Sequence, residues 1–485
     1  MTIAETAYGK VRGAEVADGI LAWRGIPYAA PPTGALRLRP PQPPEPWAGT
    51  RDALEYGNRS LQPDPVIALG APLPPMAEDC LCLNVTAPAG AAGRPVLFWL
   101  HGGGFEMGQG PDLAGDGAAF ARSHGLVVVT VNYRLGALGF LDVPGESPTG
   151  ALGLHDQVAA LRWTRDNIAA FGGNPDQVTV YGWSAGGKSV TNLLASPLAA
   201  GLFARAAQSS GGDHVKDAAQ ARALTGRFLR ALGTTSQRIR SVPAADMLAA
   251  QLAVAAPPRS SWVWRASVDG AALTRPPVNA VAAGAAAGIP LLLATCARET
   301  ALYQLQDPQA AAQADRVLAG YFGPERAAAM LERYAAAHPG LDETMLRGVA
   351  VMTDERYVVR TERLAAAHAA HGPVWRARHD GPLPGIEDSP QLAPYAPALR
   401  GAHGSDAAGI WQDGGGPASA LHSAWGAFAA GGDPGWPGYE PQTRAAMVFA
   451  DDGPHLEKDP FAFARETWSG LHWQPGPWWD IDGVS

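Results

Sequence analysis

Short apolar runs recur along the chain with room for a helix between them. The runs PVLFWL (95–100) and LVVVTV (126–131) contain almost no polar residues, which is typical of strands buried on both faces of a sheet. Segment 155–171 has helical apolar spacing and ends at Gly172-Gly173, a favourable helix stop. Strands that alternate with helices predict an α/β fold with a mostly parallel sheet. Further apolar runs occupy 178–181, 289–295 and 373–378.

One stretch after the run at 178–181 matches two catalytic motifs at once. Residues 182–186 (GWSAG) fit G-x-S-x-G, the nucleophile elbow of hydrolases, with Ser184 at the tip. Residues 182–189 (GWSAGGKS) fit the phosphate-binding P-loop, with Lys188 as the phosphate ligand. Both motifs lie between a strand and a helix, so only distant residues separate the two interpretations.

The P-loop interpretation needs a second strand that ends in an acidic residue to organise Mg²⁺. The run 126–131 leads to Asn132-Tyr133-Arg134, and the run 95–100 leads to His101. Segment 447–452 (MVFADD) does end in acids, but it lies far downstream and no nucleotide-specific pattern follows it. The sequence therefore favours the hydrolase interpretation and keeps the P-loop as the weaker alternative.

An attacking serine requires backbone N–H groups that stabilise the oxyanion, each worth roughly 3–4 kcal/mol in the transition state. The segment HGGGFEMGQG (101–110) follows an expected strand, and the amides of Gly103 and Gly104 are free of Cβ crowding. We expect the third donor at Ala185, directly after the serine. The alternative is a flexible glycine turn without a catalytic role.

The serine also requires a base and a carboxylate that orients it, in the chain order Ser, acid, His. Glu299 follows the run 289–295, and His403 lies in a later loop of small residues. With twelve histidines in the chain, His379 at the end of run 373–378 stays a rival from pattern alone. The pair His368 and His371 has helical spacing but no acidic partner motif, so no metal site is predicted.

Many ordered segments resemble the type-B carboxylesterase family, which includes bacterial p-nitrobenzyl esterases and cholinesterases. The similarity runs almost from end to end, and so many segments in the family's order make it specific. The matching segments are YGKVRG and GIPYAAPPTGALRLRPPQP near the start, EDCLCLNV (78–85), HGGGF, VNYRLGALGFL (131–141), the segment from GLHDQ to the elbow, LFARAAQSSGG (202–212) and AWGAFAAGGDPGWPGYE (424–440).

The resemblance implies Ser184 as nucleophile, His403 as general base and acid, and Glu299 as the orienting carboxylate. It favours His403 over His379, because GAHGSD matches the family's histidine loop. It implies an oxyanion hole formed by the residues named above, Gly103, Gly104 and Ala185, and a two-step acyl-enzyme mechanism without metal or organic cofactor.

The family fold implied is the α/β-hydrolase fold, with helices on both faces of a central sheet. We expect one domain over residues 1–485. Ala-rich helical insertions at roughly 215–285 and 300–370 are expected to wall a substrate gorge.

Three positions depart from the family pattern. Trp183 stands where glutamate is usual, and it either lines the substrate pocket together with Phe105 or packs against its neighbours. Lys188 stands where a small neutral residue is usual, and it either reaches solvent or binds an acidic substrate. Ser60 occupies the position of a cysteine that many members pair with the EDCL cysteine, which leaves Cys80 free.

Composition limits the partners. A net charge of −8 gives no electrostatic footprint for nucleic acid, and no run has the ~18 apolar residues of a membrane span. Three cysteines and a start without a signal-peptide pattern make the cytoplasm the expected location. The expected partner is a small-molecule ester, and the oligomeric state is not indicated. Weaker alternatives are a family member repurposed for amide cleavage or acyl transfer on a specialised metabolite, and a binding module without catalysis.

Overall fold

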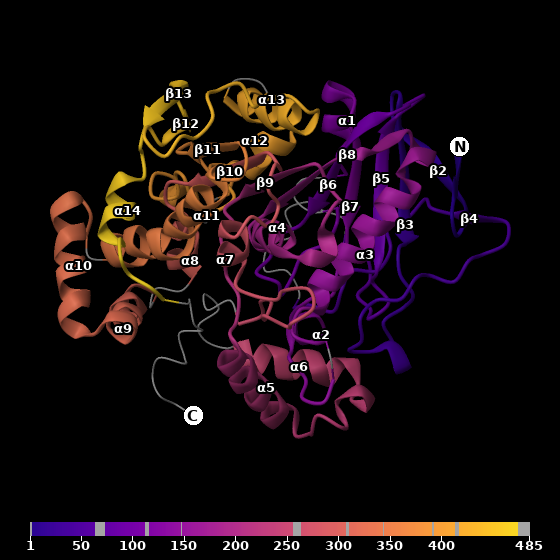
Figure 1. Cartoon of the computed structure of the whole chain (residues 1–485), viewed down its shortest axis with the longest axis horizontal. Helices are drawn as coiled ribbons and strands as arrows, with labels where there is room; N and C mark the ends of the chain where they lie inside the picture. Colours follow the sequence, from indigo (N-terminus) through magenta and orange to yellow (C-terminus); the bar gives the residue numbers. More distant parts are fainter. Residues whose placement is uncertain are drawn as a thin grey trace.

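A 13-stranded sheet runs through the molecule, in the order β1-β2-β3-β5-β7-β6-β8-β9-β10-β11-β12-β13, with β4 paired to β2 (Figure 1). The computed structural model describes residues 2–63, 73–111, 116–146, 148–255, 263–306, 310–342, 344–389, 392–412 and 417–473. The strands are β1 (Thr2–Thr6), β2 (Gly9–Ala17), β3 (Ile20–Pro27), β4 (Thr50–Asp52), β5 (Cys82–Pro88), β6 (Arg94–Leu100), β7 (Val127–Val131), β8 (Gly173–Trp183), β9 (Arg205–Ser209), β10 (Leu291–Cys296), β11 (Val374–His379), β12 (Ala445–Ala450) and β13 (Gly453–Lys458).

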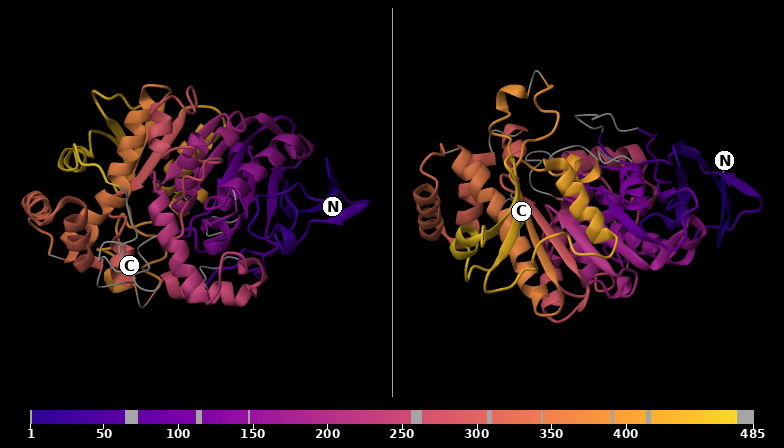
Figure 2. Two further views of the ribbon diagram at one scale, coloured as in Figure 1. Left: turned by 60° about the horizontal axis from the view of Figure 1, so that its bottom comes forward. Right: turned by 90° about the horizontal axis from the view of Figure 1, so that it is seen from above.

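The central strands of the sheet are parallel and the outer strands are antiparallel. Every neighbouring pair from β7 through β6, β8, β9, β10 and β11 to β12 is parallel. The antiparallel pairs lie outside this block, between β1, β2, β3, β5 and β7 on one side and between β12 and β13 on the other. The indigo N-terminal strands and the yellow β12 and β13 lie toward opposite ends of the molecule (Figure 2).

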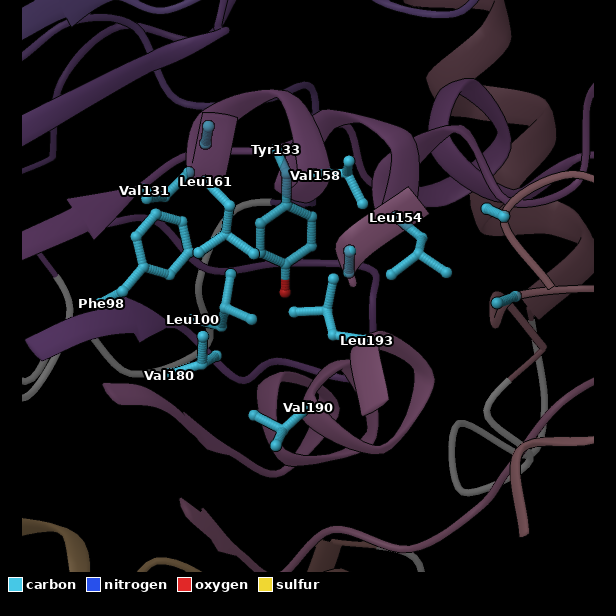
Figure 3. Packing of buried hydrophobic residues seen from close by; sticks show 14 of the residues in the cluster. Phe98, Leu100, Val131, Tyr133, Leu154, Val158, Leu161, Val180, Val190 and Leu193 are labelled. Carbon is cyan, nitrogen blue, oxygen red and sulfur yellow. The ribbon is translucent and has the colours of Figure 1, made fainter. Parts of the chain in front are cut away.

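Helices cover both faces of the parallel block, and β6 shows why. Successive side chains of a strand point to opposite faces. Phe98 and Leu100 belong to the main hydrophobic cluster, with the helices α3 (Leu152–Asn167) and α4 (Ala185–Ala195), as Figure 3 shows. Leu97 and Trp99 belong to a second cluster on the other face, with α12 (Ala407–Trp411) and α13 (Pro417–Ala429). The run at 95–100 is therefore apolar throughout because its two faces pack into two different hydrophobic clusters.

The predicted helix at 155–171 is confirmed, and it begins three residues earlier. α3 passes into a 3-10 turn at Ile168–Phe171, and Gly172 closes it with φ 84°. A positive φ is readily adopted by glycine, so the chain reverses there into β8 without strain.

The predicted helical insertions contain helices in the structure. α5 (Ala218–Leu232) and α6 (Ala244–Ala255) pack against each other at the lower edge in Figure 1. The later segment holds α8 (Ala301–Gln306), α9 (Ala310–Phe322), α10 (Pro324–Ala337), two π-helical turns (Met345–Val351 and Asp354–Val358) and α11 (Val359–Ala369). Positions 256–262, 307–309 and 343 of these insertions lie outside the described residues. The remaining helices are α1 (Ala118–His124), α2 (Gly136–Phe140), α7 (Pro277–Ala282) and α14 (Ala462–Thr467).

No helix in the described ranges has the length and apolar character needed to cross a bilayer.

The topology brings the predicted site together at one edge of the sheet. Ser184 directly follows β8, Glu299 lies three residues after β10, and His403 lies in the segment after β11. These strands belong to one parallel block, so their carboxyl ends share an edge, which is where ligands bind in α/β sheets.

Candidate active site

Ser184 occupies a strained turn between β8 and α4. Its φ of 58° and ψ of −119° are rarely adopted by a residue with a side chain. The flanking glycines allow the turn to pack. A Cβ on Gly182 would lie 2.2 Å from the carbonyl oxygen of Gly186, and a Cβ on Gly186 would lie 1.9 Å from that of Leu100. The G-x-S-x-G spacing is therefore a packing requirement of this elbow.

Two hydrogen bonds join Ser184, His403 and Glu299 in series. His403 Nε2 lies 2.8 Å from Ser184 Oγ, and His403 Nδ1 lies 2.7 Å from Glu299 Oε2. A carboxylate can only accept, so the proton resides on Nδ1 and leaves Nε2 to accept from the serine hydroxyl. The side chains are buried, with Ser184 5%, His403 6% and Glu299 0% exposed. This arrangement makes Ser184 the group poised to lose a proton.

Glu299 is fixed by the strand end that precedes it. Its second oxygen, Oε1, accepts a hydrogen bond of 2.8 Å from the backbone N–H of Cys296. Two backbone hydrogen bonds join the segment that carries His403 to the loop that carries Glu299. The N–H of Arg298 donates to the Gly401 carbonyl at 2.7 Å, and the N–H of His403 donates to the Glu299 carbonyl at 3.3 Å. The rival His379 is the last residue of β11, where it pairs in register with Cys296.

The glycine loop after β6 lies against the nucleophile. Gly103 and Gly104 have φ values of 102° and 65°. A Cβ on Gly102 would lie 3.0 Å from the Cβ of Ser184, so the two segments touch. Ala185 is the first residue of α4, and the N–H groups of the first helical turn have no partner within their own helix. The structure thus places the loop that carries Gly103 and Gly104 against the elbow, and the role of the three amides as oxyanion donors stays a prediction.

His101 anchors the start of this loop. Its Nδ1 lies 2.8 Å from the Gly102 carbonyl, and its ring stacks on Tyr133 at a centroid distance of 4.4 Å. Burial lowers the pKa of His101 to about 4, so the ring is neutral and Nδ1–H donates to the carbonyl. The Tyr133 hydroxyl donates to the His101 carbonyl at 2.9 Å.

The two predicted pocket residues occupy different environments. Trp183 is half-buried and stacks on the imidazole of His403, with centroids 5.0 Å apart and ring planes inclined by 29°. Phe105 is 1% exposed and packs against Phe140 at 4.7 Å within the main cluster. Contact with substrate stays a prediction for both residues.

Lys188 does not reach solvent, because it is only 3% exposed. It lies in the first turn of α4, and its N–H donates to the Ser184 carbonyl at 2.9 Å. Its Nζ lies 4.8 Å from the centroid of the Tyr357 ring. The expectation that its stem extends to the surface is wrong, since α4 is covered along its whole length.

Two tyrosines that were not predicted from the sequence lie around His403. The ring of Tyr303 lies 5.5 Å and that of Tyr357 5.1 Å from the imidazole. Their hydroxyls lie 3.1 Å apart. Tyr303 stands one helical turn after Glu299, so helical spacing could have indicated it. No local pattern points to Tyr357, which reaches the site from a π-helical turn.

The structure gives no support for a metal site in the described part of the chain. No group of three or more His, Cys, Asp or Glu side chains there is arranged to hold an ion. His368 Nε2 lies 2.6 Å from the Ile289 carbonyl, and His371 Nε2 lies 2.9 Å from the Ala282 carbonyl. Both rings of the HAAH pair therefore make structural hydrogen bonds.

Comparison with known proteins identifies the family of the chain. Residues 1–414 match the model of the carboxylesterase family. The chain is 36% identical to the para-nitrobenzyl esterase of Bacillus subtilis, over 96% of this chain and 98% of that protein. It is 33% identical to the phenmedipham hydrolase of Pseudarthrobacter oxydans, over 94% of this chain and 97% of that protein.

Solved structures show the same fold. A PNB esterase structure superposes with a TM-score of 0.82 at 34% identity, covering 96% of this chain and 99% of that one. A carboxylesterase of Geobacillus stearothermophilus gives a TM-score of 0.82 at 36% identity, covering 97% of this chain and 100% of that one. The α/β-hydrolase fold is therefore confirmed, and the P-loop alternative is rejected. This chain belongs to the carboxylesterase family and is a carboxylic-ester hydrolase.

Proposed function

We propose that Ser184, His403 and Glu299 hydrolyse small-molecule carboxylic esters through an acyl-enzyme intermediate. The observation that carries the proposal is the pair of hydrogen bonds made by one imidazole, at 2.8 Å to Ser184 and 2.7 Å to Glu299. A serine hydroxyl is a weak nucleophile until a base within hydrogen-bond reach accepts its proton.

In the first step, Ser184 Oγ attacks the ester carbonyl while His403 Nε2 takes the hydroxyl proton. Glu299 keeps the Nδ1 proton directed at its own carboxylate and stabilises the imidazolium that forms. His403 then gives its proton to the departing alcohol, and the acyl group stays on Ser184. In the second step, water donates a proton to His403, attacks the acyl-enzyme and releases the acid.

We propose that the backbone N–H groups of Gly103, Gly104 and Ala185 donate hydrogen bonds to the oxyanion of both tetrahedral intermediates. Support comes from the positive φ of the two glycines and from the contact between the glycine loop and Ser184. Donors fixed by the fold need no reorganisation as the negative charge develops. The hydrogen bonds of His101 and Tyr133 hold the loop in this position.

Replacement of the nucleophile tests the proposal. Ser184→Ala should reduce kcat for para-nitrophenyl butyrate by about 10⁴-fold or more, with an unchanged unfolding temperature. Ser189→Ala is the matched control, because it removes a buried hydroxyl from the same helix, one that accepts a hydrogen bond from Gln157. A fluorophosphonate probe should add one adduct to the wild type, at Ser184. Turnover by the Ser184→Ala protein within about tenfold of the wild type would refute the proposal.

We also propose that the protein works in a reducing compartment, the cytoplasm. All three cysteines are buried free thiols. Cys80 hydrogen-bonds Ser60, the residue that stands where a disulfide partner is common in the family. Burial raises the pKa of the Cys82 thiol to about 12, so it stays protonated and inert toward oxidants. Fractionation of the source cells, with activity in the cytoplasmic fraction, tests this assignment.

A further inference from the structure

The π-helical turn Asp354–Val358 carries Tyr357, whose ring lies 5.1 Å from the imidazole of His403. The hydroxyl of Tyr357 lies 3.1 Å from that of Tyr303, and Lys188 Nζ lies 4.8 Å from the centroid of its ring. Tyr357 is fully buried among these contacts. A shift of the turn would therefore displace a ring that packs beside the catalytic histidine.

The backbone around Tyr357 is irregular. Two π-helical turns, Met345–Val351 and Asp354–Val358, precede α11. Such wide turns are rare, usually short and frequent at functional sites. Helical segments in proteins owe most of their stability to tertiary packing, so the position of this turn depends on the residues that pack against it.

Two buried tryptophans near the end of the described residues hold this turn. Trp473 Nε1 donates a hydrogen bond of 2.8 Å to Glu355 Oε1, across 118 positions of the chain. Trp468 Nε1 donates to the Tyr334 hydroxyl at 2.7 Å, and that hydroxyl donates to Asp354 Oδ2 at 2.5 Å. The first two residues of the turn are thus fixed by side chains that come from a distant segment.

Trp473 is held in turn by two arginines of α11. The guanidinium carbon of Arg360 lies 4.3 Å, and that of Arg363 4.4 Å, from the centroid of the indole. A cation near an indole face is attracted by the ring. Arg360 Nη2 also donates to the Trp473 carbonyl at 3.0 Å, and Arg363 Nη2 donates to the Leu471 carbonyl at 2.5 Å. The indole is therefore fixed through its ring as well as through its N–H group.

Glu355 depends on the indole N–H. Its side chain is 1% exposed, and its Oε2 lies 3.7 Å from Arg356 Nε, while its Oε1 accepts from Trp473. A buried carboxylate oxygen that loses its donor is strongly unfavourable. Without the indole, the turn would have to move to give Oε1 another donor. Because Glu355 lies two residues before Tyr357, such a movement would reach the tyrosine ring.

We infer that Trp473 is a positioning residue of the Ser184 reaction, because it fixes the π-helical turn and so keeps Tyr357 packed beside His403. The inference rests on the proposed function, since the rate of that reaction is what Trp473 would influence. A misplacement of about 1 Å, caused by a change far from the reacting atoms, can slow a reaction by up to roughly 10²-fold.

The first experiment replaces the indole in the full chain. Trp473→Leu removes both the ring and the N–H group, and it should lower kcat for para-nitrophenyl butyrate about tenfold, with KM changed by less than about twofold. Trp473→Phe keeps a ring for the arginines and should lower kcat only about threefold. Titration with a fluorophosphonate counts the active molecules, so that unfolded protein does not enter kcat. An unchanged kcat in folded Trp473→Leu would overturn the inference, and if that variant does not fold, an unchanged kcat in Trp473→Phe would do so.

Trp375→Leu is the matched control. It removes a half-buried indole of β11 whose N–H donates to the Trp436 carbonyl at 3.1 Å. This variant should lose stability as well, but its kcat should stay within about twofold of the wild type. Equal losses of kcat in Trp375→Leu and Trp473→Leu would assign the effect to general destabilisation and overturn the inference.

The second experiment tests whether Trp473 acts through Tyr357. In a Tyr357→Leu protein the ring beside His403 is already absent, so adding Trp473→Leu should lower kcat by less than about twofold. Contacts that act independently would instead give effects that multiply, and this result would overturn the inference. If Tyr357→Leu does not fold, the kcat values of Trp473→Leu, Trp473→Phe and Trp375→Leu decide.

The two proposals fail differently. If Ser184→Ala hydrolyses para-nitrophenyl butyrate within about tenfold of the wild type, the proposed mechanism fails, and the role of Trp473 fails with it. If hydrolysis depends on Ser184 but kcat is unchanged in Trp473→Leu, only the positioning role of Trp473 is overturned.

Discussion

The indole of Trp183 stacks on the imidazole of His403, with ring centroids 5.0 Å apart and planes inclined by 29°. The indole also packs closely against the backbone of two glycines. A Cβ added to Gly102 would lie 2.7 Å from an atom of the indole ring, and a Cβ added to Gly404 would lie 3.0 Å from one. Trp183 therefore connects the glycine loop, the elbow and the segment that carries His403.

This contact predicts a role for Trp183 in positioning His403. An imidazolium over an aromatic face is stabilised by about 0.5–2 kcal/mol, and it forms only during the reaction. Trp183→Leu should therefore lower kcat for a neutral ester roughly 3- to 30-fold, with little change in KM. Trp183→Phe keeps an aromatic face and should recover part of the loss. Steady-state kinetics check this, and a change confined to KM would indicate a pocket wall instead.

Glu299→Gln should lower kcat about 10³- to 10⁴-fold. The Cys296 N–H is a fixed donor, so the glutamine oxygen should remain with it and the NH₂ group should face His403. Nδ1 would then have to accept, which moves the ring proton to Nε2 and leaves no acceptor for Ser184. The exposed Glu45→Gln variant serves as control. A Glu299→Gln enzyme within tenfold of wild type would contradict the orienting role.

Gly186→Ala should destabilise the fold by roughly 3 kcal/mol or more, because the added Cβ would lie 1.9 Å from the Leu100 carbonyl oxygen. Gly226→Ala on α5 is the matched helical control, since its nearest atom is the flexible end of Arg230 at 3.4 Å. That variant should stabilise the protein by about 0.5–1 kcal/mol. Thermal unfolding of both variants compares the effects. Equal shifts would show that the elbow tolerates a side chain.

The buried Lys188 should reduce the free energy of unfolding of the protein. Its pKa is lower in the folded protein than the ordinary value of 10.5, so folding disfavours its protonated form. The penalty is absent at high pH, grows as the pH falls from about 10.5 to 7, and is constant below 7. Lys188→Met should therefore raise the free energy of unfolding by more than about 1 kcal/mol at pH 6 and by less at pH 9. Thermal unfolding at both pH values provides the check, and a lower unfolding temperature in the variant at pH 6 would contradict it.

The central strands could be predicted because they are buried on both faces. The runs at 95–100 and 126–131 became β6 and β7, and those at 178–181, 289–295 and 373–378 became β8, β10 and β11. The order of strands in the sheet and the antiparallel edge could not be predicted. Strand pairing depends on contacts between distant segments, and a half-exposed strand such as β2 carries a weak local pattern.

The residues of the site also divide into those that could be predicted from the sequence and those that could not. Motif and chain order indicated Ser184, Glu299 and His403, since this chemistry requires those residue types in that order. The burial of Lys188 and the stacking of Trp183 had no sequence signal. Both depend on what other segments place beside them, Tyr357 in one case and His403 in the other.

The hydrogen bond between Ser184 and His403 joins residues 219 positions apart, across four neighbouring parallel strands. Closing such long loops is entropically unfavourable until the strands between them have paired. Because Ser184 precedes His403 by 219 residues, the nucleophile also emerges from the ribosome long before its base. Partly folded chains should remain inert, so that the appearance of esterase activity marks the last stage of refolding.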